Sequence, residues 1–129
     1  MPRFVIHKHY AKRAGIHYDL RIEVGNKLYS FACRKGIPTT TGKKVLLVRQ
    51  PDHEKKWLNF QGEIPSGEYG AGKLVIWDKG TYNLVEKNDK VLVLNFKGNK
   101  IKGRYIIVKL EKNNYLIFKS NKKEEKKKK

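Results

Sequence analysis

Turn signals divide the chain into short segments that alternate apolar and polar residues, and this pattern favours an all-β fold. Gly25-Asn26, Asn88-Asp89 and Asn113-Asn114 each separate two such segments. A two-residue turn between alternating runs indicates a β-hairpin. No stretch shows the periodicity of a helix longer than two turns. We therefore expect strands at residues 3–9, 16–24, 27–34, 44–49, 73–78, 81–87, 90–96, 104–111 and 115–120.

The number of strands limits how they can be arranged. About eight short strands in one small domain leave sheet edges that closure into a barrel removes. We expect a closed antiparallel β-barrel with short or no helices over residues 1–120. Asp78-Lys79-Gly80 is interpreted as a further turn. Residues 50–72, which contain Pro51, Pro65 and several glycines, are expected to be an irregular loop, and long loops are often functional.

The charge balance narrows the choice of partner. The 129 residues carry a formal net charge of +18, and the body keeps +14 without the eight-residue end at 122–129, which holds six Lys and two Glu. Such a basic body favours a polyanion, because bound phosphates release counterions, although a solubilising surface has the same composition. No basic amphipathic helix points to a membrane. Residues 121–129 are expected to form a disordered Lys-rich tail.

Cysteine use and hydropathy indicate the compartment. The single cysteine, Cys33, excludes an internal disulfide framework and a Cys-based zinc site. It lies in an apolar run, so we expect a buried structural thiol in a reducing compartment. No stretch is long and apolar enough to span a bilayer, and no signal peptide opens the chain. A cytoplasmic, intracellular protein is expected.

The chemistry is concentrated near the N-terminus. In a strand over residues 16–24, side chains alternate between the two faces, so His17, Asp19 and Arg21 share one face with Glu23. Two imidazoles and a carboxylate form a metal-binding set if His9 on the preceding strand joins His17 and Asp19. Arg21, two residues further along, is placed to hold a phosphate oxygen.

Each of these residues also has a plainer interpretation. His-x-Asp alone is a weak signal, and the same four side chains suit the solvent face of a basic barrel. Three ligands of this kind also match a non-haem iron oxygenase, although Arg21 and the basic body favour a phosphate ligand over a small oxidisable one.

Longer motifs resemble a known family. His9 followed by His17-Tyr18-Asp19-Leu20-Arg21-Ile22-Glu23 resembles the K-H…L-H-Y-D-[FL]-R-[LI]-E signature of the 3′-phosphoesterase family, found as a domain of bacterial DNA ligase D and as free-standing proteins. Four further blocks match that family in order: Lys35-Gly36, Asp52-His53, residues 60–72 (FQGEIPSGEYGAG) and residues 77–82 (WDKGTY). A looser match continues through Lys119.

The resemblance implies a site and an activity. It places metal ligands on His9, His17 and Asp19, phosphate-holding groups on Arg21 and His53, and a further basic group on Lys35. The implied enzyme is a manganese-dependent hydrolase that removes a 3′-terminal ribonucleoside and then the 3′-phosphate from DNA or RNA–DNA ends. The implied partners are a DNA ligase and a polymerase acting in non-homologous end joining, and we expect a monomer.

Four departures from the family pattern bear on this interpretation. The gap between His9 and His17 is two residues longer, so residues 11–16 should bulge. Trp57 stands where the family has a phosphate-binding tyrosine, and Val45 where it has an arginine, for which Lys44 or Arg49 is a candidate substitute. His7 stands at a frequent glutamine position, and we expect it to brace the ligands rather than to be one. A catalytically silent nucleic-acid-binding barrel is therefore the alternative.

Overall fold

The computed structural model describes residues 1–68 and 71–120 of the chain. Within these residues it contains nine strands and one short 3-10 helix, η1. The elements are β1 (Arg3–Ala11), β2 (Gly15–Val24), β3 (Lys27–Cys33), β4 (Lys44–Glu54), η1 (Lys55–Asn59), β5 (Gly62–Ile64), β6 (Gly72–Lys87), β7 (Val91–Lys97), β8 (Lys102–Lys109) and β9 (Asn114–Lys119). The expectation for residues 121–129 lies outside the described residues.

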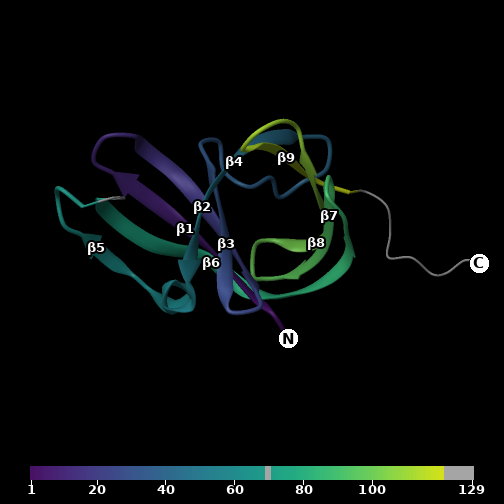
Figure 1. Ribbon diagram of the computed structural model, residues 1–129, viewed down its shortest axis with the longest axis horizontal. Helices are drawn as coiled ribbons and strands as arrows, with labels where there is room; N and C mark the ends of the chain where they lie inside the picture. Colours follow the sequence, from purple (N-terminus) through teal and green to yellow (C-terminus); the bar gives the residue numbers. More distant parts are fainter. Residues whose placement is uncertain (69–70, 121–129) are drawn as a thin grey trace, which may run out of the picture.

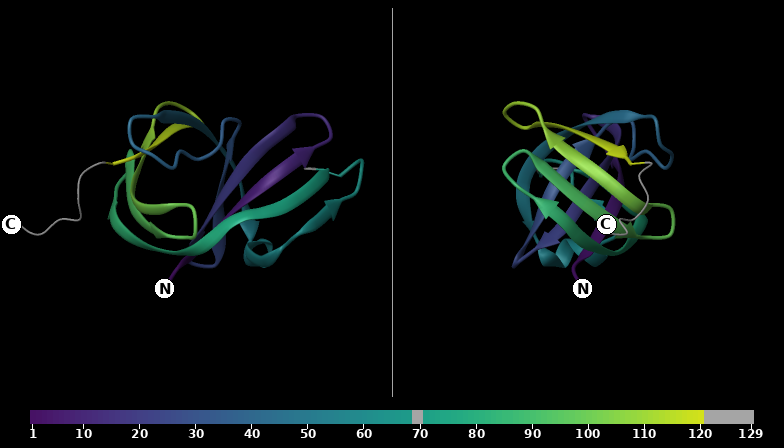
Figure 2. Two further views of the ribbon diagram at one scale, coloured as in Figure 1. Left: turned by 180° about the vertical axis from the view of Figure 1, so that it is seen from behind. Right: turned by 90° about the vertical axis from the view of Figure 1, so that its right-hand side faces the viewer.

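Eight of the strands close into an antiparallel barrel. They pair in the order β1-β2-β3-β4-β9-β8-β7-β6, and β6 pairs back to β1. The short strand β5 pairs only with the start of β6, outside this ring. Figures 1 and 2 show the β1–β2 hairpin and the start of β6 extending beyond the barrel on one side. The expected closed all-β barrel with no long helix is confirmed.

The expected turn at residues 78–80 is wrong, because β6 runs through it without a break. Its first part pairs with β1 and its last part with β7, so one long strand passes from one wall of the barrel to the next. Asp78 instead accepts N–H bonds from Asn99, Lys100 and Ile101, which fix the β7–β8 turn. Gly80 is needed because a Cβ atom there would overlap the backbone carbonyl of β7.

The expected irregular loop over residues 50–72 is also partly wrong. β4 continues to Glu54, pairing first with β9 and then with β3. Between the pairs Leu28–His53 and Ser30–Gln50 the register shifts, so Pro51 lies in a β-bulge, a position where proline is tolerated in a strand. Residues 55–59 and 62–64 form η1 and β5.

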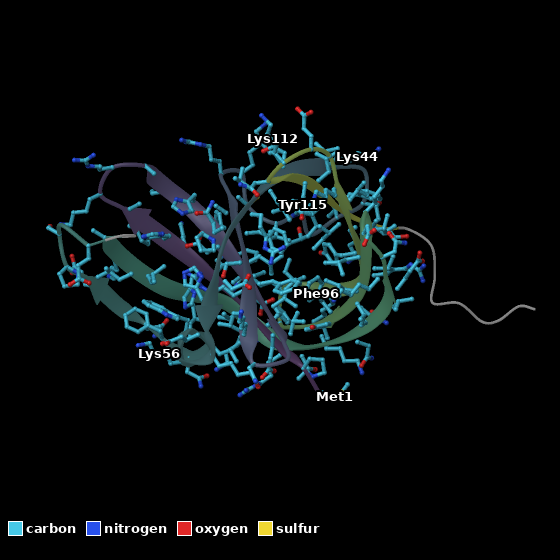
Figure 3. The ribbon with its side chains drawn as sticks, viewed as in Figure 1. Met1, Lys44, Lys56, Phe96, Lys112 and Tyr115 are labelled. Atoms are coloured by element: carbon cyan, nitrogen blue, oxygen red, sulfur yellow. The ribbon has the colours of Figure 1, made fainter. Side chains whose placement is uncertain are left out.

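The alternation along each strand divides the molecule into two sides. One face of every barrel strand fills the interior with apolar side chains, and Figure 3 shows Phe96 and Tyr115 pointing into it. Cys33 is buried in this cluster, as expected, and burial raises the pKa of its thiol. Ile37, from the loop after β3, joins the same cluster. Within the described residues, no helix is long and apolar enough to cross a membrane.

The opposite face of β1, β2 and β3 forms the floor of a groove. A second, smaller apolar cluster of Val5, Leu28 and Leu58 lies at one end of this face, where Trp57 and Ile76 pack against it. It anchors η1 over the strands. The remainder of the face carries the polar residues singled out in the sequence.

Candidate active site

Strand pairing brings the three candidate ligands together. His9 on β1 is paired with His17 on β2, and Asp19 is the next residue on the same face of β2. One ligand atom from each of these residues lies within 4.8 Å of the other two. His9 and Asp19 are buried and His17 is half-buried. The three residues form a candidate metal site, because their ligand atoms lie close enough together to bind one ion.

Asp19 is held as a carboxylate between the two imidazoles. His9 Nδ1 lies 3.1 Å from one of its oxygens and His17 Nε2 lies 3.2 Å from the other. Burial by itself would raise the pKa of Asp19, but the bonds to His17 and His9 and the Arg21 charge outweigh it and hold the pKa well below its usual range. The charged form that a metal requires is therefore already favoured.

Arg21 is fixed in place by three side chains. Its Nε–H donates to His7 Nδ1 at 3.2 Å, Nη1 donates to Ser30 Oγ at 3.3 Å, and Nη2 contacts Asp19 at 3.4 Å. The guanidinium is buried against the Trp57 ring, with Cζ 5.8 Å from the ring centroid. An arginine held this rigidly beside a metal site suits a phosphate oxygen.

His7 braces this arrangement in one protonation state. Its Nε2 lies 2.8 Å from the Phe60 carbonyl, which can only accept, while its Nδ1 accepts from Arg21. Both bonds require a neutral ring with the proton on Nε2. Burial and the Arg21 charge lower the pKa of His7 to about 4, in agreement with a neutral ring. His7 is outside the candidate metal group.

His53 reaches the same site from β4. Its Nδ1 lies 2.9 Å from the Pro51 carbonyl and 2.9 Å from Ser30 Oγ. The Pro51 carbonyl can only accept a hydrogen bond, so Nδ1 carries the ring proton. Nε2 remains able to take up and release a second proton. Burial and the Arg21 charge lower the pKa of His53. Ser30 thus joins Arg21 to His53, two residues 32 positions apart in the sequence.

A groove of about 1410 Å³ connects these residues. His9, His17, Asp19, Arg21 and His53 all line it, and the exposed Lys35 lies on its wall. All six expected site residues therefore face one cavity. Trp57 also lines the groove and packs edge-on against His53, with ring centroids 5.9 Å apart.

The two candidate substitutes for the family arginine are not equivalent. Arg49 forms an ion pair with Asp52 at 2.9 Å, and its Cζ lies 4.2 Å from the Tyr29 ring centroid, away from the groove. Lys44 lines the groove. Val45 packs in the barrel interior and also lines the groove. Of these two cations, Lys44 is the one placed to contact a substrate.

Sequence reasoning missed two contributors to the site. Ser30 is a small polar residue in an ordinary strand, and only its register with Arg21 and Gln50 reveals it as the bridge. The Phe60 carbonyl, which fixes His7, carries no signal in the side-chain pattern. Glu23, expected on the same face, lies at its far end and pairs with Arg3 and Lys55 instead.

Comparison with known sequences agrees with this geometry. Residues 7–109 match the family model described as the DNA ligase D 3′-phosphoesterase domain. The chain belongs to this family. The multifunctional non-homologous end joining DNA repair protein LigD of Mycobacterium tuberculosis is 38% identical over 128 residues, covering 95% of this chain. The multifunctional non-homologous end joining proteins LigD of Mycolicibacterium smegmatis and Pseudomonas aeruginosa are 40% and 35% identical, covering 88% and 83% of this chain.

The phosphoesterase domain is a small part of those relatives. The matched region spans 17% of the M. tuberculosis protein and 13% of the P. aeruginosa protein. Family membership identifies a hydrolase fold that acts on ester bonds. The donor set of two imidazoles and one carboxylate fits a divalent transition metal and leaves coordination positions for substrate.

Proposed function

We propose that this phosphoesterase hydrolyses phosphoesters at the 3′ ends of nucleic-acid strands. It removes a 3′-terminal ribonucleoside to leave a 3′-phosphate and then releases that phosphate to leave a 3′-hydroxyl. The observation that carries the proposal is the link from Arg21 through Ser30 to His53, beside the His9–His17–Asp19 group in one groove. A fixed cation and a proton-exchanging imidazole beside a metal site suit a phosphate centre.

Each residue has a proposed role. His9, His17 and Asp19 hold one divalent ion of the transition series, by family resemblance Mn²⁺. When bound, the ion supplies charge stabilisation at the phosphate. Arg21 binds the non-bridging phosphate oxygens through its planar fork. Once it also carries a proton on Nε2, His53 either stabilises the same oxygens or protonates the leaving oxygen. Lys35 adds positive charge on the groove wall.

The proposed substrate and pathway follow from charge and family. The groove carries the cations Lys12, Arg13, Arg34, Lys35 and Lys44 around the site, which suits a DNA or RNA–DNA strand end. The M. tuberculosis relative is a non-homologous end joining DNA repair protein, and the P. aeruginosa relative is a non-homologous end joining protein. We propose that this phosphoesterase prepares 3′ ends for a ligase and a polymerase in that pathway, acting as a monomer in the cytoplasm.

The test is a labelled primer–template ending in a single ribonucleotide, incubated with the protein and Mn²⁺. Shortening by one nucleoside to a 3′-phosphate strand supports the proposal, and a chelator should abolish it. Binding without shortening would instead favour the silent nucleic-acid-binding barrel. An unchanged strand and no binding would contradict both.

We expect the first step to be faster than the second. A terminal phosphate monoester carries more negative charge than a diester and needs more cations for binding. Arg49 is committed to Asp52 and Tyr29, and Trp57 has no hydroxyl to offer, so the monoester depends on the other groove cations, such as Lys44 and Lys35. A time course should show the 3′-phosphate strand accumulating. Direct conversion to the 3′-hydroxyl strand would show that these remaining cations suffice.

A further inference from the structure

One wall of the groove is apolar, unlike the polar floor beside it. Leu46 on β4 is 49% exposed and lines the groove together with Val48 and with Leu116 of β9. Leu46 and Leu116 are direct cross-strand partners. None of these three side chains has a polar atom, so together they form a shelf, the Leu46 shelf, that offers only van der Waals contact.

The register of the strands places this shelf next to the candidate metal site. Asp19 is paired with Ala32, and Ala32 is paired with Val48. Two strand spacings, about 10 Å, therefore separate the Asp19 and Val48 backbones, with only the small Ala32 side chain between them. β3 ends at Cys33, so in the part of the chain that the structure describes no strand lies between Leu46 and the His17 end of β2.

The distribution of charge indicates which part of a substrate meets the shelf. Lys12 and Arg13, which line the groove from the β1–β2 turn, suit the phosphates of a strand. Lys44, Arg34 and Lys35 also line the groove, but Leu46, Val48 and Leu116 themselves present no charge. At a 3′ end, the terminal nucleoside is the part of the strand that carries no phosphate other than the scissile one.

We infer that the Leu46 shelf is a subsite for the base of the 3′-terminal nucleoside, the part that leaves in the first hydrolytic step. This inference rests on the proposed function. The base lies against Leu46 and Leu116 while the scissile phosphate is held by Arg21. Because the shelf has no hydrogen-bonding group, the four bases are expected to bind similarly.

The experiment compares wild-type protein with Leu46→Ser on three strands of one sequence. The first ends in a ribonucleotide, the second in a ribose phosphate that lacks its base, and the third in a 3′-phosphate. Leu46→Ser should raise KM about tenfold for the first strand and leave KM for the other two unchanged. A pairwise comparison of this kind isolates the contact between the side chain and the base.

Leu84→Ser is the matched control, because Leu84 is 51% exposed and does not line the groove. It should leave all three KM values unchanged. An equal rise in KM for all three strands in Leu46→Ser would overturn the subsite, since it would indicate a contact with the rest of the strand. Unchanged KM for the ribonucleotide-ended strand would overturn it as well.

A binding measurement separates this inference from the proposed function. Adenosine 5′-monophosphate and inorganic phosphate are titrated into isotope-labelled protein, and the amide resonances are followed by NMR. The nucleotide, but not phosphate, should shift the amides of Leu46 and Leu116. If the protein cleaves no strand, the proposed function fails, yet this titration still decides the subsite. Shifts confined to residues other than these two would overturn it.

Discussion

The two faces of β1, β2 and β3 are buried to a similar degree but are built from opposite chemistry. The interior face carries Phe4, Ile6, Leu20, Ile22 and Phe31. The groove face carries His7, His9, Asp19, Arg21 and Ser30. All ten residues are at most 6% exposed. Burial therefore does not distinguish the stabilising face from the candidate catalytic face.

The two faces differ in the interactions that stabilise each buried side chain. An interior residue such as Leu20 contributes by removing apolar area from water, and neighbours partly relax when it is lost. A groove residue such as Arg21 is desolvated and depends on named partners, here His7, Ser30 and Asp19. Changing one face should alter stability, and changing the other should alter activity.

The largest effect is expected from Asp19→Asn. The amide keeps the shape but loses the charge that a divalent ion requires, so hydrolysis should fall about a thousandfold, ~4 kcal/mol. The variant should also fail to bind one equivalent of Mn²⁺ in a calorimetric titration. Its thermal unfolding should remain cooperative. Full Mn²⁺ binding by this variant would refute the proposed ligand set.

Leu20→Ala, on the neighbouring position of the same strand, should have the opposite profile. Loss of a fully buried leucine should lower the free energy of unfolding by about 3 kcal/mol, measured by urea denaturation. At a temperature where the variant is folded, hydrolysis should fall by less than about tenfold. A stable variant with abolished activity would break the distinction between the two faces.

Arg21→Lys tests whether the groove face needs geometry or only charge. Lysine cannot form the planar fork or bond His7 and Ser30 together, so kcat/KM should fall about a hundredfold, ~2.7 kcal/mol. The unfolding midpoint is the stability control. Near-full activity would show that a point charge is sufficient.

His7 offers a paired test of positioning. A glutamine side chain can accept from Arg21 and donate to the Phe60 carbonyl, as neutral His7 does, whereas alanine can do neither. His7→Ala should lower kcat about tenfold, as expected for a residue that braces others, and His7→Gln should restore most of it. Equal loss in both variants would favour direct participation of the imidazole.

The smallest effect is expected at Glu23, where the groove face ends in an ion-pair cluster. Its bonds with Arg3 and Lys55 lower the pKa of Glu23 to about 2 from an ordinary 4.5, so the charged form stabilises the fold above about pH 4.5. Glu23→Gln should lower Tm by roughly 5 °C at pH 7. The difference should shrink as the pH falls from 4.5 towards 2. A pH-independent difference would exclude this ion-pair origin.

Several parts of this molecule were determined by the sequence alone. Alternation of apolar and polar residues predicted most strands to within a few residues, because strand side chains have a period of two. The same alternation put His17, Asp19 and Arg21 on one face. Gly25-Asn26 predicted the β2–β3 hairpin, with Val24 paired to Lys27, because Gly25 adopts a positive φ of 60°.

Only the tertiary structure decided how these elements form a site. Gly80 and Pro51 suggested breaks, but neighbouring strands accommodate both, one through close backbone approach and one through a bulge. That bulge lies between Ser30 and His53, whose contact completes the groove. Which arginine or lysine faces the groove was likewise settled by pairing. Local patterns report the period of a single strand, whereas register, bulges and bends arise between strands that are distant in sequence.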